Sequence, residues 1–130
     1  MCTNVIVYNQ GVSNMRELVR VSKALTNETR IRMLKLLLEK DISVCEMHEI
    51  FPMSHSQVSR NLKMLMDAGF LKRWREGKCV VYVADKVNSN GYCQALLNVL
   101  ADSFNDDEVA CRDRERLQQV IAQQVRSRNS

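Results

Sequence analysis

Residues 43–69 read SVCEMHEIFPMSHSQVSRNLKMLMDAG and contain two helix starts of the same kind. Ser43 is followed three residues later by Glu46, and Ser54 is followed three residues later by Gln57. Both pairs match the capping box, in which the serine hydroxyl accepts from the third backbone amide and the third side chain accepts from the serine amide. The stretch therefore predicts two helices, beginning at Ser43 and at Ser54.

The ends of these two helices are marked as clearly. Pro52 cannot continue a helix, so the first helix is expected to run from about Ser43 to Phe51. The second is expected to run until Gly69, because glycine suits the left-handed position that follows a helix. A short helix, a tight turn and a longer helix form a helix-turn-helix.

After Gly69 the apolar period changes from about 3.6 to about 2, and β-branched and aromatic residues become frequent. Residues 70–75 and 79–84 are predicted strands, joined at residues 76–78 by a short loop that contains glycine. A helix-turn-helix followed directly by a β-hairpin is a winged helix. The predicted fold class is mainly α with a β-hairpin wing, a winged helix-turn-helix.

Two helices are predicted before this unit and two after it. The first starts at an N-cap on Ser13, and the second is expected to be central to the core because its apolar arc is wide. The first helix is expected to carry one apolar face, made by Met15, Leu18, Val19, Ser22 and Leu25, and the second is expected to direct Ile31, Leu34, Leu37 and Leu38 inward. The later helices are expected from Tyr92 to about Phe104 and from Asp107 to about Val125.

The last predicted helix carries only a thin apolar stripe, made by Val109, Leu117, Val120 and Ile121. A thin stripe on a charged helix suggests a partner helix, most simply from a second copy of the chain. The expected organisation is an arm over residues 1–12, a winged helix-turn-helix and dimerisation domain over residues 13–126, and a tail over residues 127–130.

Composition limits the class of protein. The chain has 130 residues, of which 45% are hydrophobic and 26% charged, which is typical of one globular domain. No apolar run approaches the roughly 20 residues that cross a bilayer, and residues 1–10 do not resemble a secretory signal, so we expect a cytoplasmic protein. Enzymatic activity is not expected, because the sequence shows no phosphate-binding glycine loop and no nucleophile and base pair.

The positive charge is concentrated in one stretch. The whole chain has a formal net charge of +4, and residues 54–78, with six basic and two acidic residues, carry the same excess. The basic residues are Arg60, Lys63, Lys72, Arg73, Arg75 and Lys78. Such a patch is the electrostatic mark of a nucleic-acid-binding protein, although a solvated face without a partner gives the same composition.

The position of this charge favours DNA. On the second helix of the helix-turn-helix, Val58, Leu62 and Leu65 follow helical spacing and are expected to face the core, which leaves the polar residues to enter a major groove. On the hairpin, the cations are expected to contact phosphates or the minor groove. The predicted DNA-binding residues are Ser56, Gln57, Ser59, Arg60, Asn61, Lys63, Arg73, Arg75 and Lys78.

Residues from about 21 to 83 resemble the ArsR/SmtB family of bacterial winged-helix repressors. The motifs that carry the resemblance are ALTNETRIRML at 24–34, SQVSRNLKML at 56–65, DAGFL at 67–71 and REGK at 75–78. The stretch FNDDEVACRDRERL at 104–117 is similar to arsenic-type members of the family.

The resemblance implies a homodimer joined through the first and last helices, a palindromic DNA operator, and release of DNA when an inducer binds cysteines. It assigns the dimer interface to Met15, Leu18, Val19, Leu117, Val120 and Ile121. DNA binding is expected to require no cofactor, and As(III) or Sb(III) at cysteine thiolates is the leading inducer.

The sensing motif departs from the arsenic-type pattern C-V-C-D/E-x-C. The corresponding residues are Ser43, Val44, Cys45, Glu46, Met47 and His48, so one thiol of three is present. A soft trivalent ion prefers thiolates, so other thiols must join Cys45 or the ligand must differ. Cys2, on the predicted arm, is a candidate to reach Cys45 of the other subunit, and Cys93 and Cys111 are further candidates.

The remaining cysteine and the two histidines have plain structural interpretations. Cys79, at the hairpin, is expected to pack as a small hydrophobe, and His48 is as often a core histidine as a ligand. His55 is expected to contact phosphate or water. The five cysteines form no CxxC pair, and the histidine and acidic ligands of the zinc-type family site are absent from the last helix, which disfavours zinc or nickel sensing there.

Three functions remain open at this point. The first is a dimeric repressor with a thiol-based inducer site, for which arsenite or antimonite is the leading inducer. The second uses the same scaffold to sense oxidants or persulfides, with two cysteines joining covalently. The third is a winged helix that binds proteins and never DNA.

Overall fold

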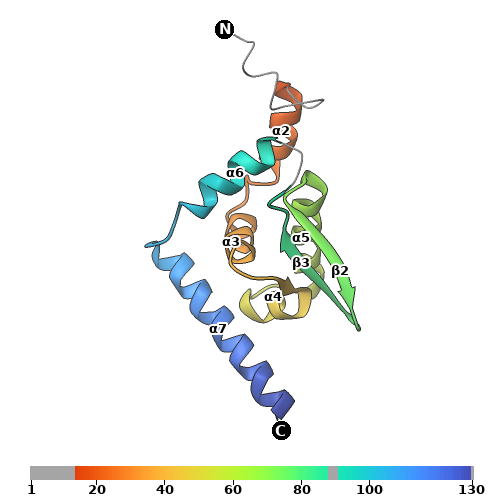
Figure 1. Ribbon diagram of the computed structural model, residues 1–130, viewed down its shortest axis with the longest axis vertical. Helices are drawn as coiled ribbons and strands as arrows, with labels where there is room; N and C mark the ends of the chain where they lie inside the picture. Colours follow the sequence, from red (N-terminus) through yellow and green to blue (C-terminus); the bar gives the residue numbers. More distant parts are fainter. Residues whose placement is uncertain (1–13, 88–90, 130) are drawn as a thin grey trace.

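Six helices and three short strands are arranged around α3 in the computed structural model, which describes residues 14–87 and 91–129 (Figure 1). The elements run in the order α2 (Met15–Lys23), α3 (Glu28–Leu37), β1 (Ile42–Ser43), α4 (Val44–Ile50), α5 (His55–Ala68), β2 (Leu71–Glu76), β3 (Cys79–Ala84), α6 (Gly91–Ala101) and α7 (Glu108–Asn129). The predicted winged helix-turn-helix is confirmed. The predicted arm lies outside the described residues.

Both predicted capping boxes are present. Ser43 Oγ accepts from the amide of Glu46 at 3.1 Å, and Ser54 Oγ accepts from the amide of Gln57 at 3.2 Å, with the reciprocal bond formed in each case. Gly69 ends α5 with φ 108°, a left-handed conformation that glycine adopts without steric cost. These local hydrogen bonds determine where the two helices of the helix-turn-helix start and stop.

Three predicted boundaries are corrected. Asn14 caps α2, because its extended backbone lets Oδ1 accept from the amide of Glu17 at 2.7 Å; the predicted cap, Ser13, lies outside the described residues. α6 ends at Ala101 rather than near Phe104. α7 continues to Asn129 rather than ending near Val125, so residues 127–129 of the predicted tail are helical.

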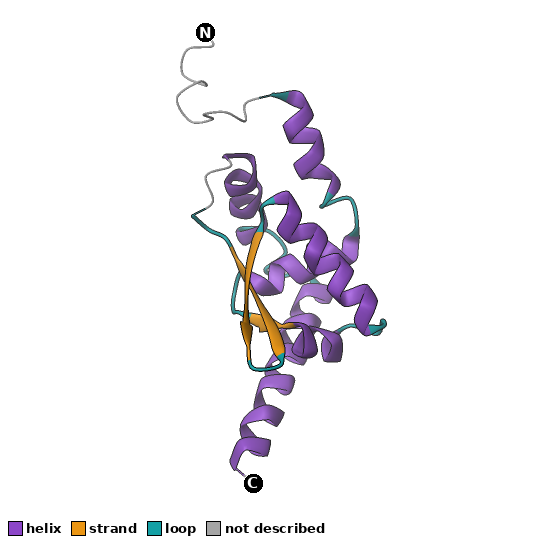
Figure 2. Ribbon diagram, turned by 90° about the vertical axis from the view of Figure 1, so that its right-hand side faces the viewer, coloured by secondary structure: helices purple, strands orange, loops and turns teal. Residues whose placement is uncertain are grey.

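The sheet has one strand more than predicted. β3 lies between β2 and β1 in a three-stranded antiparallel sheet, with Leu71 opposite Ala84 in the hairpin and Ser43 opposite Val81 on the other side. β1 has only two residues, too few to show an alternating pattern in the sequence. It attaches the N-terminus of α4 to the wing. Figure 2 shows the hairpin with its turn directed toward the end where α7 carries the C-terminus.

The core lies between α3 and the helix-turn-helix. α3 contributes Met33, Leu34, Leu36 and Leu37, all at most 2% exposed, as expected for a central helix. The other fully buried large side chains are Val21, Ile42, Met47, Val58, Leu62, Leu65, Phe70, Tyr82 and Cys93. Within the described residues, no helix has both the length and the apolarity needed to cross a membrane.

Candidate nucleic-acid interface and thiol site

The outer face of α5 is polar and accessible along its N-terminal half. Val58, Leu62 and Leu65 are fully buried, as their spacing predicted. The side chains on the outer face are Ser56, Gln57, Ser59, Arg60 and Lys63, all exposed. Serine, glutamine and arginine are side chains that bond base edges or phosphates, so this face has the chemistry of a recognition helix.

Asn61 is the exception, and its predicted outward position is wrong. The residue is half-buried, and its Oδ1 accepts from Nη1 of Arg30 at 3.3 Å. Arg30 is itself buried and donates from Nε to the carbonyl of Ala24 at 2.7 Å. Asn61 therefore joins α5 to α3 and stands behind the exposed face.

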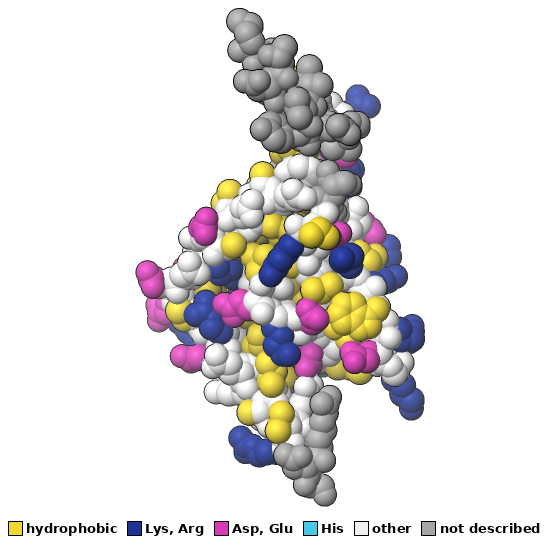
Figure 3. Space-filling model, in the orientation of Figure 1, with side chains coloured by type: hydrophobic (Ala, Val, Ile, Leu, Met, Phe, Trp, Pro, Cys, Tyr) yellow, Lys and Arg dark blue, Asp and Glu magenta, His cyan; other side chains and the backbone are white. Residues whose placement is uncertain are grey.

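The wing carries a second group of exposed cations beside α5, which packs against β2. Arg73 donates from Nη1 to the hydroxyl of Tyr82 at 3.1 Å, which fixes its direction. Arg75 and Lys78, at the hairpin tip, form no ion pair with any described residue. Figure 3 shows Lys and Arg side chains along the right-hand edge, where Figure 1 places β2.

Two of the cations in this stretch have carboxylate partners. Lys63 pairs with Asp67 at 3.1 Å, and Lys72 pairs with Asp85 at 3.8 Å. Arg60, like the two tip residues, has no such partner within the described part of the chain. Because exposed pairs contribute little free energy, Lys63 can exchange its carboxylate for a phosphate at small cost. The arrangement can bind a polyanion through a helix and a hairpin at once.

A pair of thiols lies behind the wing. The Sγ atoms of Cys45, on α4, and Cys79, at the start of β3, are 3.6 Å apart. Cys45 is exposed and Cys79 half-buried. Cys79, predicted to pack as a small hydrophobe, thus also contacts a second thiol. The two cysteines are 34 positions apart in the sequence, and the unpredicted strand β1 brings them together, so the sequence alone did not reveal the pair.

The pKa of the Cys45 thiol is raised above its usual value. The main cause is the hydrogen bond with Cys79, followed by burial and by the negative charges of Cys79, Glu49 and Glu46. Each of these favours the neutral thiol over the thiolate. The raised pKa keeps the Cys45 thiol protonated at neutral pH, a state that reacts slowly with oxidants.

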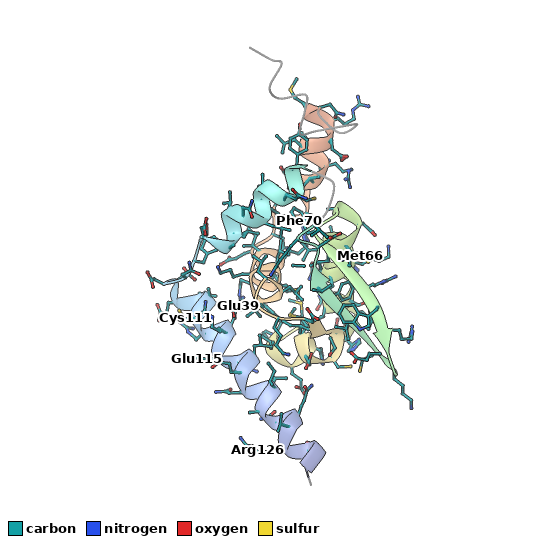
Figure 4. All side chains as sticks on the ribbon, viewed as in Figure 1. Glu39, Met66, Phe70, Cys111, Glu115 and Arg126 are labelled. Atoms are coloured by element: carbon teal, nitrogen blue, oxygen red, sulfur yellow. The ribbon has the colours of Figure 1, made fainter. Side chains whose placement is uncertain are left out.

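The other predicted sensing residues are not brought to this pair. Cys93 is fully buried and donates to the carbonyl of Ala68 at 3.3 Å, and burial raises its pKa to about 11. Cys111, on the first turn of α7, lies on the opposite side of the molecule from the wing (Figure 4). Cys2 lies outside the described residues.

The histidines do not complete a metal site. His48 is exposed, so the core interpretation is wrong, and its ring centre lies 5.3 Å from that of His55, which is exposed as well. Within the described residues, no group of three or more His, Cys, Asp or Glu side chains has the arrangement of a metal site. The thiol pair is thus the cluster of soft ligands that the described chain offers.

The predicted dimer residues divide into two groups. Met15, Leu18 and Val19 on α2 are 85%, 40% and 54% exposed and remain available to a partner. Leu117 and Val120 are buried in the core of their own chain, because α7 packs on α3 and α4, and Ile121 is packed against the same core. The prediction that the α7 stripe is free for a partner helix is corrected for these residues.

Comparisons with known proteins match this architecture. Residues 27–73, which span α3, the helix-turn-helix and the start of the wing, match the family described as "Bacterial regulatory protein, arsR family". The chain is 34% identical over 73 residues to a cadmium resistance transcriptional regulatory protein CadC homolog of Staphylococcus aureus, a match that covers 55% of this chain and 60% of the relative. It is 37% identical over 73 residues to the arsenic resistance transcriptional regulator ArsR1 of Pseudomonas putida, covering 53% and 57%.

These curated relatives are therefore matched over little more than half of their length. Two solved structures extend the comparison. HlyU from Vibrio cholerae superposes with a TM-score of 0.57 at 28% identity, covering 68% of this chain and 91% of that one. The homodimeric winged helix-turn-helix DNA-binding domain of Mb0332 from Mycobacterium bovis gives 0.56 at 26% identity, covering 66% and 76%.

Proposed function

We propose that this chain, whose residues 27–73 are an ArsR-family helix-turn-helix domain, is a transcriptional repressor that binds a palindromic DNA operator as a homodimer and releases it when an inducer binds its thiols. The observation that carries the proposal is the joint placement of the exposed α5 face and the exposed wing cations on two elements in contact. Such a regulator acts in the cytoplasm.

The proposed dimer uses the exposed apolar face of α2, made by Met15, Leu18 and Val19. A two-fold axis presents two copies of α5 to successive turns of the major groove, about 34 Å apart, and this geometry requires a palindromic site. The homodimeric state of the M. bovis domain supports this assembly.

The leading inducer is arsenite or antimonite. Trivalent arsenic and antimony prefer thiolates, and a thiol pair lies on the described surface. The arsenic and cadmium resistance regulators among the relatives support a thiophilic ion. The second candidate is a repressor that senses oxidants or persulfides, for which the same pair of sulfurs would form a disulfide.

The test of DNA binding is a salt series. Fluorescence anisotropy of the DNA upstream of the gene is measured with the purified, reduced full chain between about 50 and 200 mM salt. We expect the affinity to fall by several powers of ten over this range, because phosphate contacts release counterions. Binding that does not change with salt, or no binding, would favour the protein-interaction alternative.

A double variant tests the assignment of the surface. Arg60→Ala with Arg75→Ala is expected to weaken binding at least tenfold and to lower the salt slope by about one for each phosphate contact removed. Arg16→Ala is the control, because Arg16 is exposed on α2, at the end of the molecule away from the wing tip (Figure 1). Equal effects of the two changes would contradict the proposed interface.

A further inference from the structure

The thiol pair lies between two elements of the winged helix-turn-helix, α4 and the wing. Cys45 lies on the first turn of α4, the helix before the recognition helix, and Cys79 is the first residue of β3. Ser43 pairs with Val81 in the antiparallel sheet. Cys45 lies two residues after Ser43 and Cys79 two residues before Val81, so the register brings the two cysteines opposite each other. A ligand shared by both sulfurs would connect α4 directly to the wing.

The pair is accessible from solvent. Cys45 is exposed, and Cys79 lines a cleft of about 470 Å³ whose walls come from β1, α4, the wing and α7. Trp74, which is 42% exposed, and Gln124 line the same cleft. A ligand carried by the two sulfurs therefore has room for a third substituent beside an aromatic ring.

The spacing of the sulfurs fits a shared ion. Two sulfurs bound to one ion at about 2.3 Å, with an angle between about 90° and 110°, lie roughly 3.3 to 3.8 Å apart. The observed separation of 3.6 Å is inside this range. A disulfide would require a sulfur–sulfur distance of about 2.05 Å, so the two sulfurs would have to approach each other.

We propose that Cys45 and Cys79 form the inducer site and chelate one trivalent arsenic or antimony atom across α4 and β3. This inference rests on the proposed function, since it locates the inducer of that repressor. With arsenite the step is As(OH)₃ plus two thiols giving (RS)₂AsOH and two waters. Two S–As bonds form, two As–OH bonds break, the thiol protons leave in the waters, and no oxidant or reductant takes part.

Chelation acts on DNA binding through the hairpin tip. Cys79 faces Glu76 in the last pair before the turn, so it adjoins Lys78 and lies one strand position from Arg75. The arsenic bridge replaces a weak contact between thiols by two covalent bonds and holds the tip against α4. A tip held there does not follow the DNA backbone, so the ligand favours the DNA-free conformation, and DNA must weaken arsenic binding by the same factor.

Trp74 gives a direct signal, because it is the single tryptophan of the chain and lines the same cleft as Cys79. Tryptophan fluorescence of the reduced full chain is titrated with phenylarsine oxide and with arsenite, without DNA. We expect saturation at one arsenic per chain. Cys45→Ser and Cys79→Ser are each expected to weaken binding about 100-fold or more, because the second thiol acts at high effective concentration. Cys111→Ser is the matched control and is expected to bind like the wild type.

A second measurement uses the wild-type chain and does not depend on how the variants fold. Phenylarsine oxide condenses with two thiols and releases one water, so the bound thiols become resistant to alkylation. Peptide mass spectrometry is expected to find Cys45 and Cys79 protected together. Protection of Cys2 or Cys111 in place of Cys79, or an unchanged affinity in Cys79→Ser, would overturn the inference.

DNA release separates this inference from the proposed function. If the arsenical protects the pair while the wild type shows no salt-dependent DNA binding, the repressor proposal fails and the site stands. If DNA binding is intact and arsenite releases it equally from wild type and Cys79→Ser, the site fails and the repressor stands. Release by a hydroperoxide with formation of a Cys45–Cys79 disulfide, and no release by the arsenical, would also overturn the inference.

Discussion

Arg32 binds both carboxylate oxygens of Asp113, through Nε at 2.9 Å and Nη2 at 2.7 Å, and so joins α3 to α7. The carboxylate is 6% exposed, and the guanidinium also lies over the ring of Phe51, 4.9 Å from its centre. The hydrogen bond to Asp113 raises the pKa of Arg32. This contact anchors the last helix to the helix-turn-helix, which no local signal in the sequence indicates.

Asp113→Ala is expected to lower the free energy of unfolding by about 1 to 2 kcal/mol, because it leaves the half-buried guanidinium of Arg32 without its partner. The measurement is urea denaturation followed by circular dichroism. Glu108→Gln is the control, since its pair with Arg112 is 85% and 67% exposed and is expected to contribute less than about 0.5 kcal/mol. An equal loss in the free energy of unfolding for the two variants would show that the Arg32–Asp113 pair stabilises the fold no more than an exposed ion pair does.

Two neighbouring residues of α5 are expected to respond in opposite ways. Asn61→Ala removes an acceptor of Arg30 and is expected to cost about 1 to 2 kcal/mol of stability. Arg60→Ala is expected to leave stability within about 0.5 kcal/mol and to weaken DNA binding, because Arg60 is exposed. Denaturation and anisotropy are measured on both variants. A stable Asn61→Ala that fails to bind DNA would return Asn61 to the base-reading face.

Stability is expected to fall at alkaline pH because of Cys93. Its folded pKa is raised to about 11 by burial, whereas an unfolded thiol titrates near 8.5. The contribution of the neutral Cys93 thiol to stability is fully present below the pKa of the unfolded thiol. It is lost as the pH rises through the pKa of the folded state. The loss of stability is on the order of 3 kcal/mol between about pH 8.5 and 11. The wild type and Cys93→Ala are compared by urea denaturation across this range, so that other alkaline groups cancel; parallel curves would contradict the assignment.

Leu18→Glu with Val19→Glu is expected to dissociate the dimer. The two side chains are 40% and 54% exposed on α2, and burying them in an interface contributes about 1 to 2 kcal/mol each, so the dissociation constant is expected to rise roughly 10-fold to 100-fold or more. Sedimentation velocity over a dilution series measures this constant. Val87→Glu is the control, because Val87 is apolar and 80% exposed but lies beyond β3, outside the proposed interface. A monomeric wild type would contradict the proposed assembly.

The sequence by itself determined the helix-turn-helix and the hairpin. Each of their signals is local: the capping boxes join residues three apart, Gly69 acts through its own backbone, and the strands pair across a loop at Gly77 and Lys78. Such signals can be recognised in a sequence because the interacting groups are only a few residues apart, so the covalent chain keeps them close together. The exposed face of α5 followed from the same periodicity, with Asn61 as the one misplaced residue.

Contacts between residues far apart in the sequence became visible only in the folded structure. β1 is too short to show a pattern, yet its pairing with β3 places Cys45 against Cys79. The apolar stripe of α7 was predicted to contact a second chain. The sequence of a helix shows that it has an apolar face but does not show whether its own chain or a partner packs on that face. In the folded chain, α3 and α4 cover Leu117 and Val120. Contacts between distant segments depend on the packing of the whole core, so their partners become defined only when the chain has folded.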